Sequence, residues 1–231
     1  MTTDPGRQQA LEGVRVLEVG TAIAGQLAAM LLADFGADVV KVEPPAGDPM
    51  RARPGFAMWN RGKRSVVQGD VDVDALVAAA DIVVTGGGKP EHRLDAAEAS
   101  AAHPGLVVLD LPPFLEETPW SGGEESAALL WAASGMALRQ SSYEGGPVDP
   151  VAPYVLYLQG IWAAAAAAAA LFERTESGFG QVVTVAGVHA TMVAASATLV
   201  MDPAVPEVLA NYGPGGPHPM YTRYQCADGV W

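Results

Sequence analysis

The fold is decided by the stretch VRVLEVGTAIAGQLAAMLLADFGADVVKVE, residues 14–43. Residues 14–20 are a short apolar run that ends in glycine, which is the pattern of a buried strand. Residues 21–25 are expected to form a loop, and residues 26–35 carry apolar side chains at helical spacing before a terminating glycine. Residues 37–43 are a second apolar run. The stretch therefore predicts a βαβ unit whose two strands are parallel.

The same alternation of strands and helices continues along the chain. Further strands are predicted at residues 65–67, 82–85, 106–109 and 181–185, and helices at residues 74–80, 94–102, 127–138 and 189–201. Strands that alternate with helices predict an α/β fold, with a Rossmann-like, doubly wound parallel sheet.

Composition narrows the class of protein. The chain has 231 residues, half of them hydrophobic, and a net charge of −13, which argues against a nucleic-acid partner because phosphate neutralisation needs a basic surface. The single cysteine excludes an internal disulfide and fits a reducing compartment. The N-terminal residues are polar, which predicts no signal peptide, and the histidines show no metal-ligand spacing. We expect a cytoplasmic protein without a metal.

An alanine-rich stretch, LYLQGIWAAAAAAAALFERTESGFGQ at residues 156–181, raises the question of a membrane span. Residues 151–172 carry no charge, which meets the length of a span. Alanine, however, is only weakly apolar and is the strongest helix former, and Gln159 and Gly160 interrupt the stretch. The favoured interpretation is a helix packed closely on a sheet, with a membrane span as the alternative.

The last residues predict an incomplete hairpin. Residues 221–226 are expected to form a strand, followed by an Asp-Gly turn and two residues of a returning strand. This pattern suggests part of a longer protein, or a subunit that another chain completes. The alternative is an exposed tail.

Basic residues gather after the second predicted strand. Within residues 41–64 only Glu43 and Asp48 oppose six cations, which are Lys41, Arg51, Arg53, Arg61, Lys63 and Arg64. Ligands of α/β sheets bind at the carboxyl ends of strands, and such cations suit a ligand with several phosphates. A solvated basic loop is the alternative.

A dinucleotide site is the weaker interpretation of the same region. GTAIAG at residues 20–25 lacks the middle glycine of G-x-G-x-x-G, although Glu43 lies near where a ribose-binding acid belongs. A dehydrogenase therefore remains only a minor alternative.

The N-terminal motif resembles the family III CoA-transferases, the CaiB–BaiF group, which includes formyl-CoA and carnitine CoA-transferases and α-methylacyl-CoA racemases. The residues that carry the resemblance are LEGVRVLEVG, LLADFGADVVKVEPPAGDPMR and NRGKRS. Later motifs of the family are matched in order by HPGLVVL, AASGM, ERTESGFGQ and YQCADGVW. The resemblance implies a large CoA-binding α/β domain over residues 1–205, the start of a smaller domain at residues 206–231, and pairs of chains interlocked as rings.

The resemblance also implies a nucleophilic aspartate, which attacks the acyl-CoA thioester, forms a mixed anhydride and then becomes an aspartyl-CoA thioester. In the family it lies four residues before the glycine that opens the next helix. Here that glycine is Gly160, so the helix is expected to begin after it, and Leu156 occupies the position of the aspartate. Asp149, in a proline-rich loop, is a remote candidate to replace the aspartate as nucleophile. The racemases of the family require a histidine near the position of Ser126, and this sequence has none there.

Several CoA contacts follow from the resemblance. The family positions used for CoA correspond to Ile23, Ala24, Arg64, Lys89 and Arg93. Ile23 and Ala24 match the loop that lines the pantetheine, and Arg64 and Arg93 are retained basic positions. Lys89 follows the glycines of TGGGK, residues 85–89, which either offer backbone donors to a phosphate or form a loop that has lost its function.

The leading hypothesis is a CoA-transferase-like chain that handles acyl-CoA without a nucleophile of its own, with no covalently bound cofactor. It is expected to pair with a second family III chain or with itself. An active CoA-transferase with an unrecognised nucleophile and a non-enzymatic CoA-binding scaffold are the alternatives.

Overall fold

The computed structural model describes residues 9–86, 94–139, 146–196 and 224–230. The backbone forms two compact units. The first comprises Met1–Glu125 with Leu156–Gly187, and the second comprises Ser126–Val155 with Val188–Trp231. The predicted domain boundary at residues 205 and 206 lies outside the described residues and stays a prediction.

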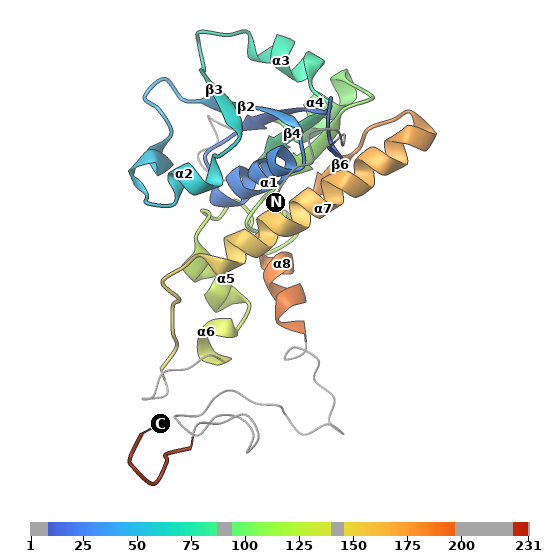
Figure 1. Cartoon of the computed structure of the whole chain (residues 1–231). Helices are drawn as coiled ribbons and strands as arrows, with labels where there is room; N and C mark the ends of the chain where they lie inside the picture. The colour runs from blue at the N-terminus through green and yellow to red at the C-terminus, as the bar shows by residue number, and fades with distance from the viewer. Residues whose placement is uncertain (1–8, 87–93, 140–145, 197–223, 231) are drawn as a thin grey trace. The chain divides into compact units, whose positions relative to one another are not determined.

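The first unit is built on a six-stranded parallel sheet, which confirms the predicted fold class (Figure 1). The strand order is β3-β2-β1-β4-β5-β6, and the order reverses beside β1, where the chain crosses to β4. In register, Val16 lies opposite Val39 on one side and Ile82 on the other. The strands are β1 (Arg15–Val19), β2 (Asp38–Glu43), β3 (Lys63–Val67), β4 (Ile82–Thr85), β5 (Val107–Asp110) and β6 (Val182–Thr184).

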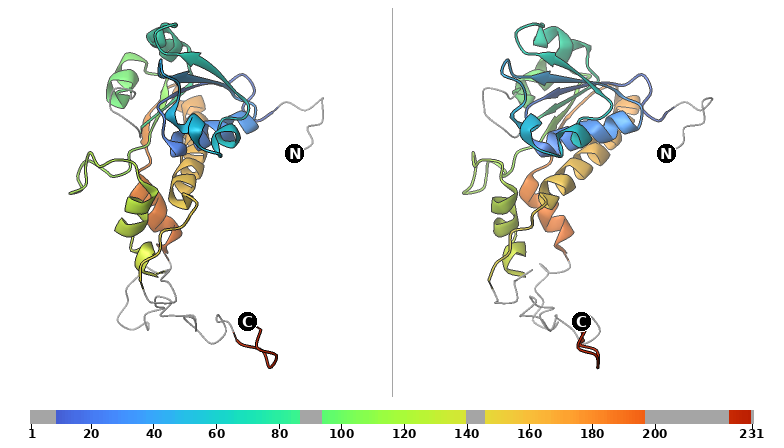
Figure 2. Two further views of the ribbon diagram at one scale, coloured as in Figure 1. Left: turned by 90° about the vertical axis from the view of Figure 1, so that its left-hand side faces the viewer. Right: turned by 60° about the vertical axis from the view of Figure 1, so that its left-hand side comes forward.

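Helices cover both faces of this sheet (Figure 2). On one face the sheet packs against α1 (Ile23–Asp34) and α7 (Tyr154–Ser177). On the other it packs against α3 (Val73–Ala79) and α4 (Ala96–Ala102). The loop between β2 and β3 carries a 3₁₀ turn, Pro49–Ala52, and the short helix α2, Phe56–Trp59.

The alanine-rich helix α7 is a layer of the first unit. Ala163, Ala167 and Ala170 lie in the apolar core beneath the sheet. Alanine loses no side-chain entropy on burial and lets the helix backbone approach the strands. By length and composition α7 is also apolar enough to cross a membrane, and it is the one described helix that is. Its packing on the sheet is that of a core helix.

The second unit contains the helices α5 (Ala127–Ala133), α6 (Met136–Arg139) and most of α8 (Gly187–Ala194). The hydroxyl of Ser126 caps α5 by accepting a hydrogen bond from the Leu129 amide, and the indole of Trp131 donates to the Val148 carbonyl. The single helix predicted at residues 127–138 is wrong, because Gly135 adopts a φ of 75° and ends α5.

Three other predicted boundaries need correction. Helix α1 begins at Ile23, inside the predicted loop, and α7 begins at Tyr154, directly after a proline, instead of after Gly160. Gly160 lies inside α7, at a point where a side chain would clash with the Ala24 carbonyl oxygen. The predicted helix at residues 189–201 begins earlier, at Gly187, and its last residues lie outside the described part.

At the C-terminus, the Asp-Gly turn is present, with a hydrogen bond of 2.7 Å from the Cys226 amide to the Val230 carbonyl. Residues 224–226, however, form no strand.

Candidate functional site

The connection from β1 to α1 lies at the carboxyl edge of the sheet, where the strand order reverses. Gly20 ends β1 with a φ of 131°, which only glycine adopts without strain. Ala22 is the N-cap residue of α1, and its methyl side chain cannot accept a hydrogen bond from the first-turn amides. Amides in the first turn of a helix have no partner within the helix, so this end depends on groups from elsewhere.

One such group is Glu125, whose carboxylate oxygen Oε1 accepts a hydrogen bond of 3.3 Å from the Ile23 amide. The two residues are 102 positions apart in the chain. Burial raises the pKa of Glu125 to about 7, although the hydrogen bond from the Ile23 amide opposes this rise. Its second oxygen, Oε2, is buried and has no hydrogen-bond partner among the described residues. Sequence reasoning missed Glu125, because no short-range pattern links it to α1.

The start of α7 crosses the same edge. A Cβ on Gly160 would lie 2.7 Å from the Ala24 carbonyl oxygen, so α7 and the start of α1 are in close contact. Leu156 lies one helical turn before Gly160 on the same face of α7 and is 3 % exposed. Next to it, the ring of Tyr157 lies 6.3 Å from that of Trp59 on α2.

Gln159 attaches α7 to the ends of two further strands. Its Nε2 donates to the carbonyl of Pro112, after β5, and to that of Val185, after β6, at 3.0 and 2.8 Å. Its Oε1 is buried without a partner among the described residues. The amide group therefore holds α7 across the edge where the sheet ends.

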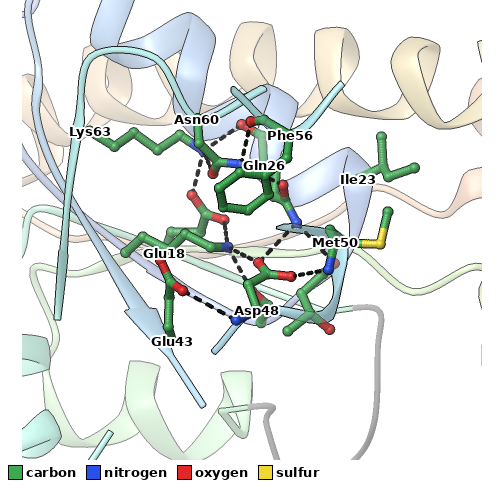
Figure 3. A network of polar contacts seen from close by, with 12 residues as sticks. Glu18, Ile23, Gln26, Glu43, Asp48, Met50, Phe56, Asn60 and Lys63 are labelled. Carbon is green, nitrogen blue, oxygen red and sulfur yellow. Dashed lines mark hydrogen bonds and ion pairs between the residues drawn. The ribbon is translucent and has the colours of Figure 1, made fainter. Parts of the chain in front are cut away.

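A buried ion-pair network lies beside this edge, between β1, β2 and β3 (Figure 3). Lys41 contacts Glu18 at 2.5 Å and Asp48 at 2.9 Å, and Lys63 contacts the other oxygen of Glu18 at 2.6 Å. All four side chains are at most 2 % exposed. Two cations and two anions leave the network neutral, which a buried cluster requires.

Amide side chains complete the network. Gln26, on α1, donates to Asp48 at 3.2 Å and accepts from Asn60 at 2.7 Å. Lys63 also donates to the backbone carbonyl of Gln26 and to Asn60 Oδ1. The network thus fastens α1 and the loop between β2 and β3 to the sheet.

Charge balance sets the pKa values inside the network. Burial alone would raise the pKa of Glu18, but its two lysine partners outweigh burial and lower it. Burial would lower the pKa of Lys41, but Glu18 and Asp48 outweigh it, so the pKa is raised. For Lys63 burial prevails over its one close carboxylate and lowers the pKa.

The interpretation of residues 41–64 as cations for a ligand with several phosphates stays a prediction, but five of the six cations have acidic partners. Of the six basic residues at positions 41–64, Lys41 and Lys63 are buried in the network, and three others pair at the surface. Those three are Arg51 with Glu43, Arg61 with Asp34 and Arg64 with Asp38. Proximity in sequence indicated a cationic surface, but the partners Glu18, Asp34 and Asp38 come from elements far along the chain.

The structure describes three of the five predicted CoA contacts. Ile23 and Ala24 form the first turn of α1, where Ala24 is fully buried. Arg64 lies on the edge strand β3, with its guanidinium 2.6 Å from Asp38 and its side chain 68 % exposed. Lys89 and Arg93 lie outside the described residues. These assignments stay predictions.

The substitute nucleophile Asp149 is exposed and belongs to the second unit. Among the described residues no three histidine, cysteine or acidic side chains are grouped to hold a metal ion.

Comparisons with known proteins agree with this architecture. CoA-transferase family III matches residues 11–231. The succinyl-CoA–D-citramalate CoA-transferase of Chloroflexus aurantiacus is 30 % identical over 96 % of this chain and 60 % of its own length. The alpha subunit of the succinyl-CoA–L-malate CoA-transferase of the same organism is 30 % identical over 80 % of this chain and 45 % of its own. The chain thus spans roughly half the length of such relatives.

Solved structures show the same fold. A hypothetical protein of Mycobacterium tuberculosis, Rv3272, is 28 % identical, with a TM-score of 0.74 over 84 % of this chain and 59 % of that one. A CaiB/BaiF family protein of Brucella suis has a TM-score of 0.76 over 90 % of this chain and 62 % of that one, at 24 % identity. With the family matched over almost the whole sequence, this chain belongs to CoA-transferase family III.

Proposed function

We propose that this chain is the acyl-CoA-handling, non-nucleophilic half of a CoA-transferase, and that a second family III chain supplies the catalytic carboxylate. The observation that carries the proposal is Leu156. Leu156 is apolar and buried, and the motif spacing assigns its position to the family's aspartate. Leucine has no lone pair, so it cannot form the anhydride through which acyl transfer proceeds.

The geometry around Leu156 supports this proposal. Leu156 lies in the first turn of α7, on the face that meets the start of α1. A helix N-terminus stabilises a nearby carboxylate, so the backbone at position 156 would suit an aspartate, although its side chain is leucine. The family's architecture with a leucine at this position is what we expect of a chain whose partner performs the chemistry.

A heteromer is supported by one of the relatives. The succinyl-CoA–L-malate CoA-transferase protein of Chloroflexus aurantiacus is an alpha subunit, which implies a further subunit in that enzyme. For this chain we propose acyl-CoA as ligand, with Ile23, Ala24, Arg64, Lys89 and Arg93 as its contacts. The alternative is an active CoA-transferase that uses another carboxylate, for which Asp149 is the candidate.

Trapping of an acyl-enzyme tests the proposal. The full chain is incubated with succinyl-CoA and then treated with borohydride, and the intact mass and peptide masses are measured. We expect no modification of the wild-type chain and a modified residue 156 in the Leu156→Asp variant. Leu156→Asn is the matched control, because it is polar but not nucleophilic.

Labelling of the wild-type chain would contradict the proposal. If that label disappeared in Asp149→Asn, the alternative with its own nucleophile would replace it.

A further inference from the structure

The first turn of α1 and the carboxyl group of Glu125 form a polar environment that the proposed contacts leave unexplained. Ala22 offers no cap, and α1 has no acidic residue in its first turn. Glu125 Oε1 accepts a hydrogen bond from the Ile23 amide, while the buried Oε2 has no partner among the described residues. A buried polar atom without a partner costs free energy, so such a group is typical of a site that a ligand completes.

The chemistry of the site selects the ligand group. A carboxyl group with an unpaired buried oxygen favours its neutral form, because burial disfavours the charge. In that form Oε1 accepts from the Ile23 amide and Oε2–H donates. The N-terminus of α1 also favours a negative or partly negative atom. Both features point to an oxygen that accepts hydrogen bonds.

We propose that Glu125, as a neutral carboxylic acid, donates a hydrogen bond from Oε2 to the carbonyl oxygen of the acyl-CoA thioester at the N-terminus of α1. This subsite rests on the proposed function for its ligand. A neutral acid that donates to a carbonyl or oxyanion is an established device in enzymes that activate carbonyl groups. Glu125 would then contact the acyl group, whereas the proposed CoA contacts bind the rest of the molecule.

Access to the subsite depends on the segment that carries Glu125. Between β5 and α5 the chain has no helix or strand, and residues 119–124 are exposed. The start of this segment is held in place, because Leu111 and Phe114 are buried, and the ring of Trp120 lies 5.7 Å from that of Phe114. Exposed stretches open at low free-energy cost, so we expect a thioester to reach Oε2 by displacing residues 119–124.

Among the charged groups near α1, Glu125 is the one whose pKa lies near neutral pH. Glu18, Lys41, Asp48 and Lys63 are paired with one another in the buried network. Burial raises the pKa of Glu125 to about 7, against the opposing hydrogen bond from Ile23. The proton on Oε2 is therefore present at pH 6 and largely lost at pH 8.5.

Calorimetric titration of the full chain with acetyl-CoA and with S-ethyl-CoA tests this inference, because the two ligands differ only at the thioester carbonyl. At pH 6 we expect acetyl-CoA to bind about five- to tenfold tighter, the worth of one hydrogen bond. The preference should disappear at pH 8.5. In Glu125→Gln it should persist at both pH values, because the amide nitrogen donates without titrating, and in Glu125→Ala it should be absent at both.

Glu124→Gln is the matched control, because Glu124 is exposed and adjacent, and it should behave as the wild type. Thermal unfolding shows whether each variant is folded. If Glu125→Ala does not fold, the pH-independent preference of Glu125→Gln carries the test. Equal binding of both ligands by the wild type at pH 6, or a preference that Glu125→Gln leaves pH-dependent, would overturn the inference. Failure of both ligands to bind would overturn it together with the proposed acyl-CoA function.

Discussion

At the scale of single residues, Glu125 makes stability depend on pH in the direction opposite to that of an ion-paired carboxylate. Its pKa rises from the ordinary 4.5 to about 7 in the folded chain because of burial. Between these values the native state binds more protons than the unfolded state, so the free energy of unfolding falls as the pH rises. The shift corresponds to at most about 3 kcal/mol, lost fully above pH 7.

We therefore expect Glu125→Gln to be more stable than the wild type at pH 8 by up to about 3 kcal/mol, and nearly equal at pH 4.5. Urea unfolding at several pH values measures the difference, with Glu124→Gln as control. A difference that does not change between pH 5 and pH 8 would contradict the assignment of this titration to Glu125.

Lys41 offers a second prediction at this scale. Replacing it with methionine keeps much of the volume but leaves Asp48 without its lysine and Glu18 with only one, both still buried. Removing one member of a buried ion-pair network typically costs about 3–5 kcal/mol. Arg61→Met is the control, because its pair with Asp34 is exposed and should contribute less than about 1 kcal/mol. Denaturant unfolding of both variants measures this, and a loss below 1 kcal/mol for Lys41→Met would refute the structural role of the network.

At the scale of elements, the contact between α1 and α7 depends on Gly160. A Cβ there would lie 2.7 Å from the Ala24 carbonyl oxygen, and backbone cannot yield as a flexible side chain does. Alanine improves helix propensity by about 1 kcal/mol, whereas forcing the elements apart costs about 1–3 kcal/mol. We expect Gly160→Ala to lose up to about 2 kcal/mol of stability in thermal or urea unfolding.

The control for this prediction is Gly105→Ala, where a Cβ meets nothing within 4 Å. That change should be neutral or slightly stabilising, because it restricts the unfolded chain. An equal response of both variants would show that Gly160 is not a close-contact position.

Element types were predictable from local pattern, but some boundaries were not. The strands were found because residues buried on both faces form continuous apolar runs. The start of α7 was misplaced because Gly160 is typical of a helix boundary, and its packing on Ala24 is invisible in the sequence. Similarly, the start of α1 at Ile23 has no capping side chain to mark it.

At the scale of the whole molecule, assembly is the outstanding prediction. We expect native mass spectrometry of the protein purified from its own source to show a complex with a second family III chain that retains the aspartate. Recombinant chain alone is the control, because it shows which species form without the partner. A lone or self-paired species from the native source would contradict the heteromer.

The sequence by itself determined the α/β class, the parallel βαβ unit and the membership of CoA-transferase family III, since these depend on local periodicity and on contiguous motifs. It also determined that leucine occupies position 156. Only the tertiary structure decided the partners of the charged groups. Lys41 and Lys63 looked like ligands for phosphate but neutralise Glu18 and Asp48, and Glu125 meets the Ile23 amide across 102 residues. Electrostatic partners are set by distance in space, which the fold alone creates.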